Sequence, residues 1–177
     1  MCGRYALYSE KLIKSKFNLN ITKNYNISPN QEVVIINEKF NTIKFNWGII
    51  PDWKKTLIIN ARFETINKKK TFKNLKKCVF VANGYYEWLR LESKKIPFYH
   101  FNSNNELIFF AGIYNSKGCC IVTKPSVSYL SKIHGRQPFF LKESQIEEWI
   151  STNNDFFFYD EIINFHSVSN SVNKIWN

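Results

Sequence analysis

A cysteine stands directly behind the first methionine, in the opening run MCGRY. If Met1 is removed, Cys2 carries an α-amine and a thiol on one residue. The reference pKa is about 8 for the amine and about 8.5 for the thiol, so both groups are partly deprotonated at neutral pH. An aldehyde can form an imine with the amine, and the neighbouring sulfur can then close a thiazolidine ring. Position alone favours the alternative, a small buried cysteine without chemistry.

Glu87 could move protons for such a reaction. In an expected strand it shares one face with Tyr85 and Leu91, and a carboxylate on a mostly apolar face is costly to bury. Burial would raise its pKa and suit it to proton transfer near neutral pH. In the alternative arrangement this face meets solvent while Tyr86 and Trp88 face the core, and the sequence leaves both open.

His134 is a second candidate for proton transfer. It lies in the run IHGRQP, where glycine and proline indicate a loop, and loops often display functional side chains. Imidazole titrates near neutral pH and can donate or accept a proton. A loop histidine without any role is the alternative. His100 and His166 lie in strand-like runs and are expected to be structural or surface residues.

An amide and three arginines lie close to these candidates in sequence. Asn60 and Arg62 follow an apolar run, where the amide could orient a substrate and the guanidinium could hold a phosphate. Arg4 and Arg136 each lie within two residues of a candidate reactive side chain. The planar guanidinium matches phosphate oxygens, so these arginines suggest a phosphate-bearing substrate.

The composition favours a polyanionic partner. The formal net charge is +11 and the pI is about 9.5, which suits nucleic acid or an anionic membrane surface, although a solvated lysine-rich surface is the alternative. Trp53, in the run PDWKK, is an aromatic residue among basic ones and could stack on a base. A core tryptophan is the competing interpretation of Trp53.

Other classes of protein fit less well. No apolar run is long enough to span a bilayer and no signal peptide opens the chain, so a cytosolic or nucleoid location is expected. The four cysteines, Cys2, Cys78, Cys119 and Cys120, form no CxxC pair with matching partners, and we expect thiols and no metal site. Nothing in the sequence indicates a cofactor.

The elements that must position these residues are mostly strands. A chain of 177 residues with 44% hydrophobic content fits one domain, residues 1–177. A helix is expected after Ser9, with another around Trp149. The dipeptide Asn83-Gly84 predicts a hairpin between two of the strands. Strands are expected at 33–36, 43–49, 78–82, 85–91, 98–101, 107–114, 119–123 and 162–168. This pattern favours a mostly antiparallel α+β fold with a few short helices.

The order of nine short motifs is more specific than any one of them. The chain contains, in sequence, MCGRY, YNISPNQ, WGIIPDW, NARFET, KCVFVANGYYEW, PFY, AGIY, IHGRQPFFL and VSNSVNK. From Cys2 to about Lys174 it resembles the SOS-response-associated peptidase family, whose members are also called abasic-site processing proteins. The resemblance implies a compact, mostly β fold with a positively charged groove for single-stranded DNA.

The resemblance also implies a reaction and its residues. Met1 is removed, and Cys2 becomes joined through a thiazolidine to the ring-opened sugar of an abasic site. The other matching catalytic positions are Asn60, Glu87 and His134. The positions that match the family's phosphate contacts are Arg4, Arg62 and Arg136. Trp53 lies near the region where the family stacks on DNA bases.

The sequence departs from the family pattern at several matched positions. Val81 replaces a proline, Asn83 an aspartate, Gly135 an aspartate beside His134, and Gln137 an apolar residue. The change at Gly135 alters the charge expected near His134. The implied partner is single-stranded DNA with abasic sites, for a protein expected to be a monomer without an obligate protein partner.

Two other functions fit the same residues. A cysteine peptidase would use Cys2 as nucleophile and His134 as base, and removal of its own Met1 would be a limited form of that activity. A non-catalytic single-strand binding module would need only the basic and aromatic residues. The crosslinking protein, with lyase-like chemistry, remains the principal prediction.

Overall fold

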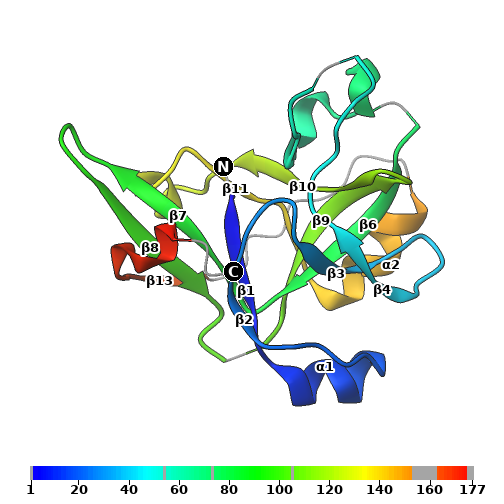
Figure 1. The fold of residues 1–177 in the computed structure, drawn as a ribbon, viewed down its shortest axis with the longest axis horizontal. Helices are drawn as coiled ribbons and strands as arrows, with labels where there is room; N and C mark the ends of the chain where they lie inside the picture. The colour runs from blue at the N-terminus through cyan, green and yellow to red at the C-terminus, as the bar shows by residue number, and fades with distance from the viewer. Residues whose placement is uncertain (1, 54, 73, 105, 153–162, 175–177) are drawn as a thin grey trace.

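The computed structural model describes residues 2–53, 55–72, 74–104, 106–152 and 163–174. Two β-sheets, two short α-helices and several 3-10 turns make up the described chain (Figure 1). The sheets are largely antiparallel, which confirms the predicted α+β class. The helices and strands are β1 (Arg4–Leu7), α1 (Glu10–Phe17), β2 (Asn24–Ile27), β3 (Glu32–Ile36), β4 (Thr42–Asn46), β5 (Asn60–Arg62), β6 (Lys76–Ala82), β7 (Gly84–Arg90), β8 (Lys95–Phe101), β9 (Ile108–Asn115), β10 (Gly118–Pro125), β11 (Arg136–Pro138), β12 (Phe140–Leu141), α2 (Ile146–Ser151) and β13 (Asn164–Ser167).

The two sheets share one hydrophobic core. The first sheet has the strand order β13-β8-β7-β1-β2, and the second has β11-β10-β9-β6-β3-β4, with β12 on β9 and β5 on β10. Tyr5 of the first sheet packs edge to face on Phe80 and Phe110 of the second, with ring centroids 6.5 Å and 6.3 Å away. Such aromatic pairs stabilise the interface beyond the area they bury. The core therefore fixes β1, and Cys2 just before it, against the second sheet.

The hairpin predicted at Asn83-Gly84 is wrong. The strands on either side of it, β6 and β7, do not pair with each other. β6 lies between β9 and β3 in the second sheet, whereas β7 lies between β1 and β8 in the first. Asn83-Gly84 therefore carries the chain from one sheet to the other, and the true hairpin of this region is formed by β7 and β8.

Hydrogen bonds of the Asn83 side chain explain why this Asn-Gly pair carries the chain from one sheet to the other. Asn83 Oδ1 accepts hydrogen bonds from the backbone N–H groups of Tyr8 and Ser9, at 2.7 Å and 3.1 Å, and its Nδ2 donates to Ser9 Oγ. A Cβ at Gly84 would lie 2.4 Å from the carbonyl oxygen of His100, so only glycine fits there. A turn dipeptide read locally cannot reveal these partners, which are distant in sequence.

The other expected elements are present with small shifts. Helix α1 begins one residue after Ser9 and buries Ile13, and α2 buries Trp149 in the core. Strand β4 ends at Asn46, before Trp47, although Trp47 is fully buried. The last expected strand corresponds to β13, and its first expected residue, Ile162, lies outside the described residues.

The outer face of β7 is covered near the end of the described chain. A 3-10 turn at Asn170–Asn173 places Val172 against Tyr86 in a small hydrophobic cluster. The indole Nε1 of Trp88 donates to Asn173 Oδ1 at 2.9 Å. This turn therefore fixes one face of the β7–β8 hairpin. Among the described residues, no helix combines the length and apolar character needed to cross a membrane.

Candidate active site

Cys2 is completely buried, one residue before Gly3 and two before the start of β1. Its Sγ donates a hydrogen bond to the backbone carbonyl of Arg4, at 3.6 Å. Burial raises the pKa of the Cys2 thiol, and the nearby Glu87 carboxylate raises it further. The resting sulfur is therefore a protonated thiol, and it needs a change in its surroundings before it can attack an electrophile. Met1 lies outside the described residues.

Asn60 holds the backbone of Cys2. It is the first residue of β5, which runs parallel to β10 with Asn60 opposite Ile121. Its Nδ2 donates to the Cys2 carbonyl oxygen at 2.8 Å. Its Oδ1 is buried and accepts no hydrogen bond from any described residue. A buried acceptor left open in this way is costly, so Asn60 is ready to bind a donor beside Cys2.

Glu87 lies in the middle of β7, opposite Phe98 of β8, and is only 3% exposed. Burial raises the pKa of the Glu87 carboxyl, and the electrostatic interaction with His134 acts in the opposite direction. Of the two arrangements the sequence left open, the structure adopts the one with a buried carboxyl. Tyr85, on the same face, is also buried.

His134 lies in the loop before β11 and is half-buried. Its Nδ1 lies 3.0 Å from the backbone nitrogen of Arg136. The same Nδ1 lies 3.1 Å from the Arg136 carbonyl oxygen, so it meets a backbone donor and a backbone acceptor of one residue. A Cβ at Gly135 would meet no atom within 4 Å. The space there could therefore hold the aspartate found in the family pattern.

A cavity of about 390 Å³ lies beside these residues. Glu87 and His134 both line it, together with Gly3 and Ile59, the sequence neighbours of Cys2 and Asn60. The remaining lining residues are Arg4, Pro29, Trp88, Arg90, Lys95 and Asn173. The structure thus brings the four expected catalytic residues to one cavity or to positions adjacent to residues that line it.

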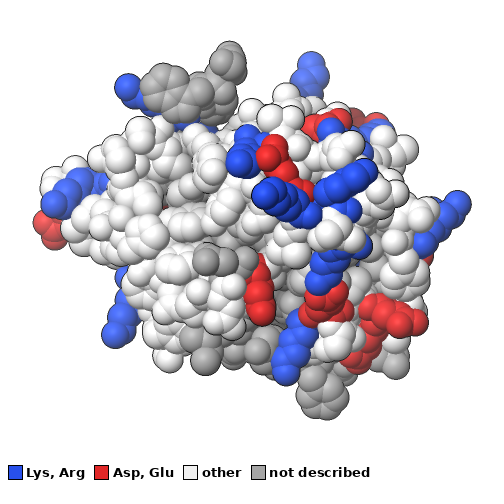
Figure 2. Space-filling view, turned by 90° about the horizontal axis from the view of Figure 1, so that it is seen from below, with Lys and Arg blue, Asp and Glu red and all other residues white. Residues whose placement is uncertain are grey.

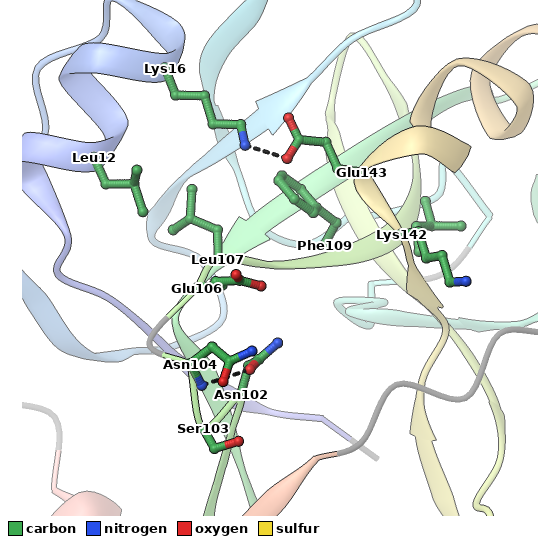
Figure 3. Close-up of a pocket in the computed structure, with 11 residues that line it drawn as sticks. Leu12, Lys16, Asn102, Ser103, Asn104, Glu106, Leu107, Phe109, Lys142 and Glu143 are labelled. Atoms are coloured by element: carbon green, nitrogen blue, oxygen red, sulfur yellow. Dashed lines mark hydrogen bonds and ion pairs between the residues drawn. The ribbon is translucent and has the colours of Figure 1, made fainter.

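A larger hollow lies elsewhere and holds none of the expected site residues. It has a volume of about 570 Å³ and lies between α1, the segment joining β8 to β9, and the residues around Lys142 (Figure 3). Lys16 forms an ion pair with Glu143 at its edge. The described residues along its wall include no cysteine or histidine, so this hollow lacks the combination of groups found around Cys2.

The guanidinium groups of Arg4, Arg62 and Arg136 differ in their exposure and in their hydrogen-bond partners. Arg62 is exposed at the end of β5, and Arg4 lines the cavity, its guanidinium donating to the Gly3 carbonyl oxygen at 3.0 Å. Arg136 instead makes two hydrogen bonds to the Glu64 carboxylate, at 2.8 Å and 3.0 Å. A phosphate could bind Arg136 only alongside Glu64 or by displacing it.

Trp53 is 67% exposed, so it is not a core tryptophan. Its indole is free to offer a flat surface to a ligand. The face of the molecule drawn in Figure 2 shows lysines and arginines scattered among acidic residues rather than one continuous basic patch.

Sequence reasoning did not single out four other residues along the cavity wall: Trp88, Arg90, Lys95 and Asn173. Trp88 follows Glu87 in sequence, and that adjacency was the only available signal. Arg90 and Lys95 become neighbours only through the pairing of β7 with β8. Asn173 joins them through the turn close to the end of the chain.

The fold and the cavity define a β-rich protein with a buried cysteine, near the start of the chain, beside a cavity lined by a buried glutamate and a histidine. Residues 1–175 match the family described as SOS response associated peptidase (SRAP), and the chain belongs to this family. Among its relatives, abasic site processing protein YoqW of Bacillus subtilis is 33% identical, over 87% of this chain and 82% of YoqW. Abasic site processing protein YedK of Escherichia coli is 28% identical, over 85% of this chain and 79% of YedK.

Solved structures share the fold. A crystal structure of a protein from Bacteroides thetaiotaomicron superimposes with a TM-score of 0.81 at 21% identity, and covers 96% of this chain and 93% of its own. A second, from Bordetella bronchiseptica, gives a TM-score of 0.77 at 16% identity. At these identities the likeness concerns the arrangement of the chain alone.

Proposed function

We propose that this protein processes abasic sites in single-stranded DNA by joining them covalently to Cys2. Membership of the SRAP family and the names of its relatives support an abasic-site substrate. The observation that carries the proposal is the hydrogen bond from Asn60 to the Cys2 carbonyl, next to a cavity lined by Glu87 and His134. The core shared by both sheets supports treating residues 1–177 as one domain.

The first step opens the sugar. An abasic deoxyribose is a cyclic hemiacetal, and its aldehyde appears when the C1′ hydroxyl loses a proton and the ring oxygen gains one. Glu87 and His134 face the same cavity and exchange these protons. The raised pKa of Glu87 suits this role because the carboxyl can donate a proton nearer neutral pH than an exposed glutamate.

The second step forms the imine. Removal of Met1 gives Cys2 a free α-amine, whose nitrogen attacks C1′ and releases one water. The open Oδ1 of Asn60 accepts a hydrogen bond from a reacting donor, while its Nδ2 keeps the Cys2 backbone in place. Orientation of this kind replaces a bimolecular encounter with a step inside the complex.

The third step closes the ring. A protonated imine places positive charge beside the Cys2 sulfur, which lowers the pKa of the buried thiol and favours the thiolate. The sulfur adds to C1′, the imine electrons return to nitrogen, and the product is a thiazolidine. Because C1′ is no longer an aldehyde, β-elimination at the neighbouring carbon stops and the strand stays intact. Glu87 assists slow reversal by returning a proton to the same ring.

The DNA is held by three arginines and one tryptophan that take no part in the covalent step. Arg4, Arg62 and Arg136 bind phosphates, and Trp53 stacks on a base. The three phosphate contacts give a slope of log affinity against log salt of about −2, since each phosphate contact on a single strand contributes about −0.7. Arg136 exchanges Glu64 for phosphate as the strand binds.

A peptidase role is the second candidate, and one observation weighs against it. A cysteine nucleophile of that class works as a thiolate beside a base. Here burial raises the pKa of Cys2, and the thiol donates to the Arg4 carbonyl. Turnover of unrelated peptides without a DNA adduct would favour the peptidase. A non-catalytic binding module would show DNA binding that is insensitive to Cys2→Ala.

A denaturing gel tests the proposal. The protein is incubated with a single-stranded oligonucleotide carrying one abasic deoxyribose, or carrying its tetrahydrofuran analogue, which cannot open to an aldehyde. We expect a band of protein plus DNA, stable to denaturant, with the deoxyribose only. Equal bands with both oligonucleotides, or no band with either, would contradict covalent capture through the sugar.

A further inference from the structure

The β7–β8 hairpin carries two cations that the reaction described above does not use. Arg90 and Lys95 are directly opposite each other at the last paired position of the hairpin. Both side chains are exposed, and both line the cavity that also holds Glu87 and His134. They therefore form a cationic pair on the wall of the candidate active site.

This pairing is unfavourable in the free protein. Residues directly opposite on antiparallel strands have Cβ atoms about 4.5–5.5 Å apart, and like charges at that separation repel. Neither Arg90 nor Lys95 forms an ion pair with any described residue, whereas Arg136 is paired with Glu64 and Lys76 with Glu38. Two unneutralised cations held side by side form a site that an anion would stabilise.

Hydrogen bonds to the rest of the protein hold the β7–β8 hairpin in place close to Arg90. Trp88, two residues before Arg90 in β7, donates its indole N–H to Asn173. Asn26 fixes the 3-10 turn that carries Asn173. Its Nδ2 donates to the carbonyl oxygens of Val172 and Lys174, at 3.1 Å and 2.8 Å. The cations therefore project from a braced strand pair rather than from a free loop.

The pair lies on a different part of the fold from two of the expected phosphate-binding residues. Arg62 on β5 and Arg136 on β11 belong to the second sheet, whereas β7 and β8 belong to the first. In Figure 1 the β7–β8 hairpin extends to the left of β1, and the segment between β4 and β6 lies at the upper right. A strand whose damaged sugar reaches Cys2 would then pass cationic groups on both sides.

We propose that Arg90 and Lys95 together bind one backbone phosphate of single-stranded DNA, on the flank of the abasic site away from Arg62 and Arg136. This inference rests on the proposed function, because it takes its orientation from the covalent site at Cys2. The two cations straddle one phosphodiester, whose charge cancels their mutual repulsion. The contact reads the backbone and no base, so it adds affinity without sequence preference.

The first test measures binding of a single-stranded oligonucleotide without damage, over a range of salt. We expect Arg90→Ala with Lys95→Ala to weaken binding and to reduce the salt slope by at least about 0.7, the contribution of one phosphate. The loss should therefore be roughly threefold smaller at 200 mM salt than at 50 mM. The matched control removes two exposed lysines of α1, Lys11→Ala with Lys14→Ala. Equal losses in both double variants would overturn the proposal.

The second test locates the phosphate. Neutral methylphosphonates are placed one at a time on each side of an abasic site, and the rate of covalent capture is measured below saturation. We expect one position, on one flank, where neutralisation slows the wild type but not Arg90→Ala with Lys95→Ala. If every position slows both proteins by the same factor, the pair binds no particular phosphate.

A third measurement separates binding from folding. Arg90→Glu replaces a repulsive pair with an attractive one, so we expect a higher Tm together with weaker DNA binding. A lower Tm with weaker binding would assign the two residues a structural role instead. Failure of the proposed function is distinguishable, because the wild type would then form no adduct while the undamaged-strand measurement still reports on the pair.

Discussion

The residues proposed to carry out the covalent step, called the floor here, and the residues proposed to contact DNA, called the rim, differ in their surroundings. The floor residues Cys2 and Glu87 are buried, and burial raises the pKa of both. The rim residues Arg62, Arg90 and Trp53 are exposed, so DNA can reach their side chains without a rearrangement of the core. The difference suggests a division of work in which the floor determines the rate of the covalent step and the rim determines affinity.

The largest effect is expected from removing the thiol on the floor. Cys2→Ser keeps the amine, so an imine still forms, but no sulfur is present to close the ring and the imine hydrolyses. We expect complete loss of the stable adduct on a denaturing gel. Cys78→Ser, at another fully buried cysteine, is the matched control and should leave the adduct intact if the protein folds. Stable adduct from Cys2→Ser would refute the role of the thiol.

Glu87→Gln should have the next largest effect. The amide keeps the size of the side chain and removes its proton transfer, so covalent capture at saturating DNA should slow by about 10²–10⁴-fold. Binding of undamaged DNA should change little. A variant that loses affinity and keeps its maximal rate would place Glu87 with the rim instead.

The variant Glu87→Gln also tests how the free energy of unfolding depends on pH. Burial raises the pKa of Glu87 above its value in the unfolded chain, so ionisation on the alkaline side favours unfolding. The wild type should therefore lose stability as pH rises from the unfolded pKa through the raised one, and Glu87→Gln should lose less. Thermal unfolding over that range checks the sign, and parallel curves for the two proteins would contradict it.

Asn60→Leu should have a smaller effect, confined to the rate. It removes the hydrogen bond to the Cys2 carbonyl, and one such bond contributes about 0.5–1.5 kcal/mol, or roughly 2- to 13-fold. The maximal rate of adduct formation should fall by about this factor, with unchanged affinity for undamaged DNA. Rescue of the rate by Asn60→Gln would show that the amide, rather than its exact length, is what positions Cys2.

Trp53→Ala should have the smallest effect, confined to affinity. Base stacking on an aromatic side chain contributes about 1–3 kcal/mol, and we expect the lower end, about fivefold, because Trp53 is exposed. Trp53→Phe should keep most of this affinity, since a flat ring remains. A fall in the maximal rate at saturating DNA would break the proposed separation between floor and rim.

The two regions also differ in how well the sequence predicted them. The floor residues lie inside short motifs, so they could be selected as catalytic candidates without knowledge of the fold. Their burial could not: Glu87 fitted either face of its strand until the packing of the first sheet on the second decided it. The mostly antiparallel α+β class followed from alternation of apolar residues along several segments.

The rim depended on contacts between distant parts of the chain. The ion pair of Arg136 with Glu64 joins residues 72 positions apart, and no local pattern announces it. Asn83-Gly84 misled the prediction because its partners, at Tyr8 and Ser9, lie far away in sequence. Arg90 and Lys95 are close in sequence, but they face each other only because β7 turns back onto β8 in a hairpin that the sequence analysis did not predict.

The most direct test of the central claim counts free thiols in the adduct. The protein is joined to an abasic oligonucleotide, denatured, treated with a maleimide and weighed intact. Ring closure through Cys2 predicts a mass lacking Met1 and one water, with one label fewer than the four cysteines of the free chain. An adduct that retains Met1, or one that takes up a label on every cysteine, would contradict capture by the amine and thiol of Cys2.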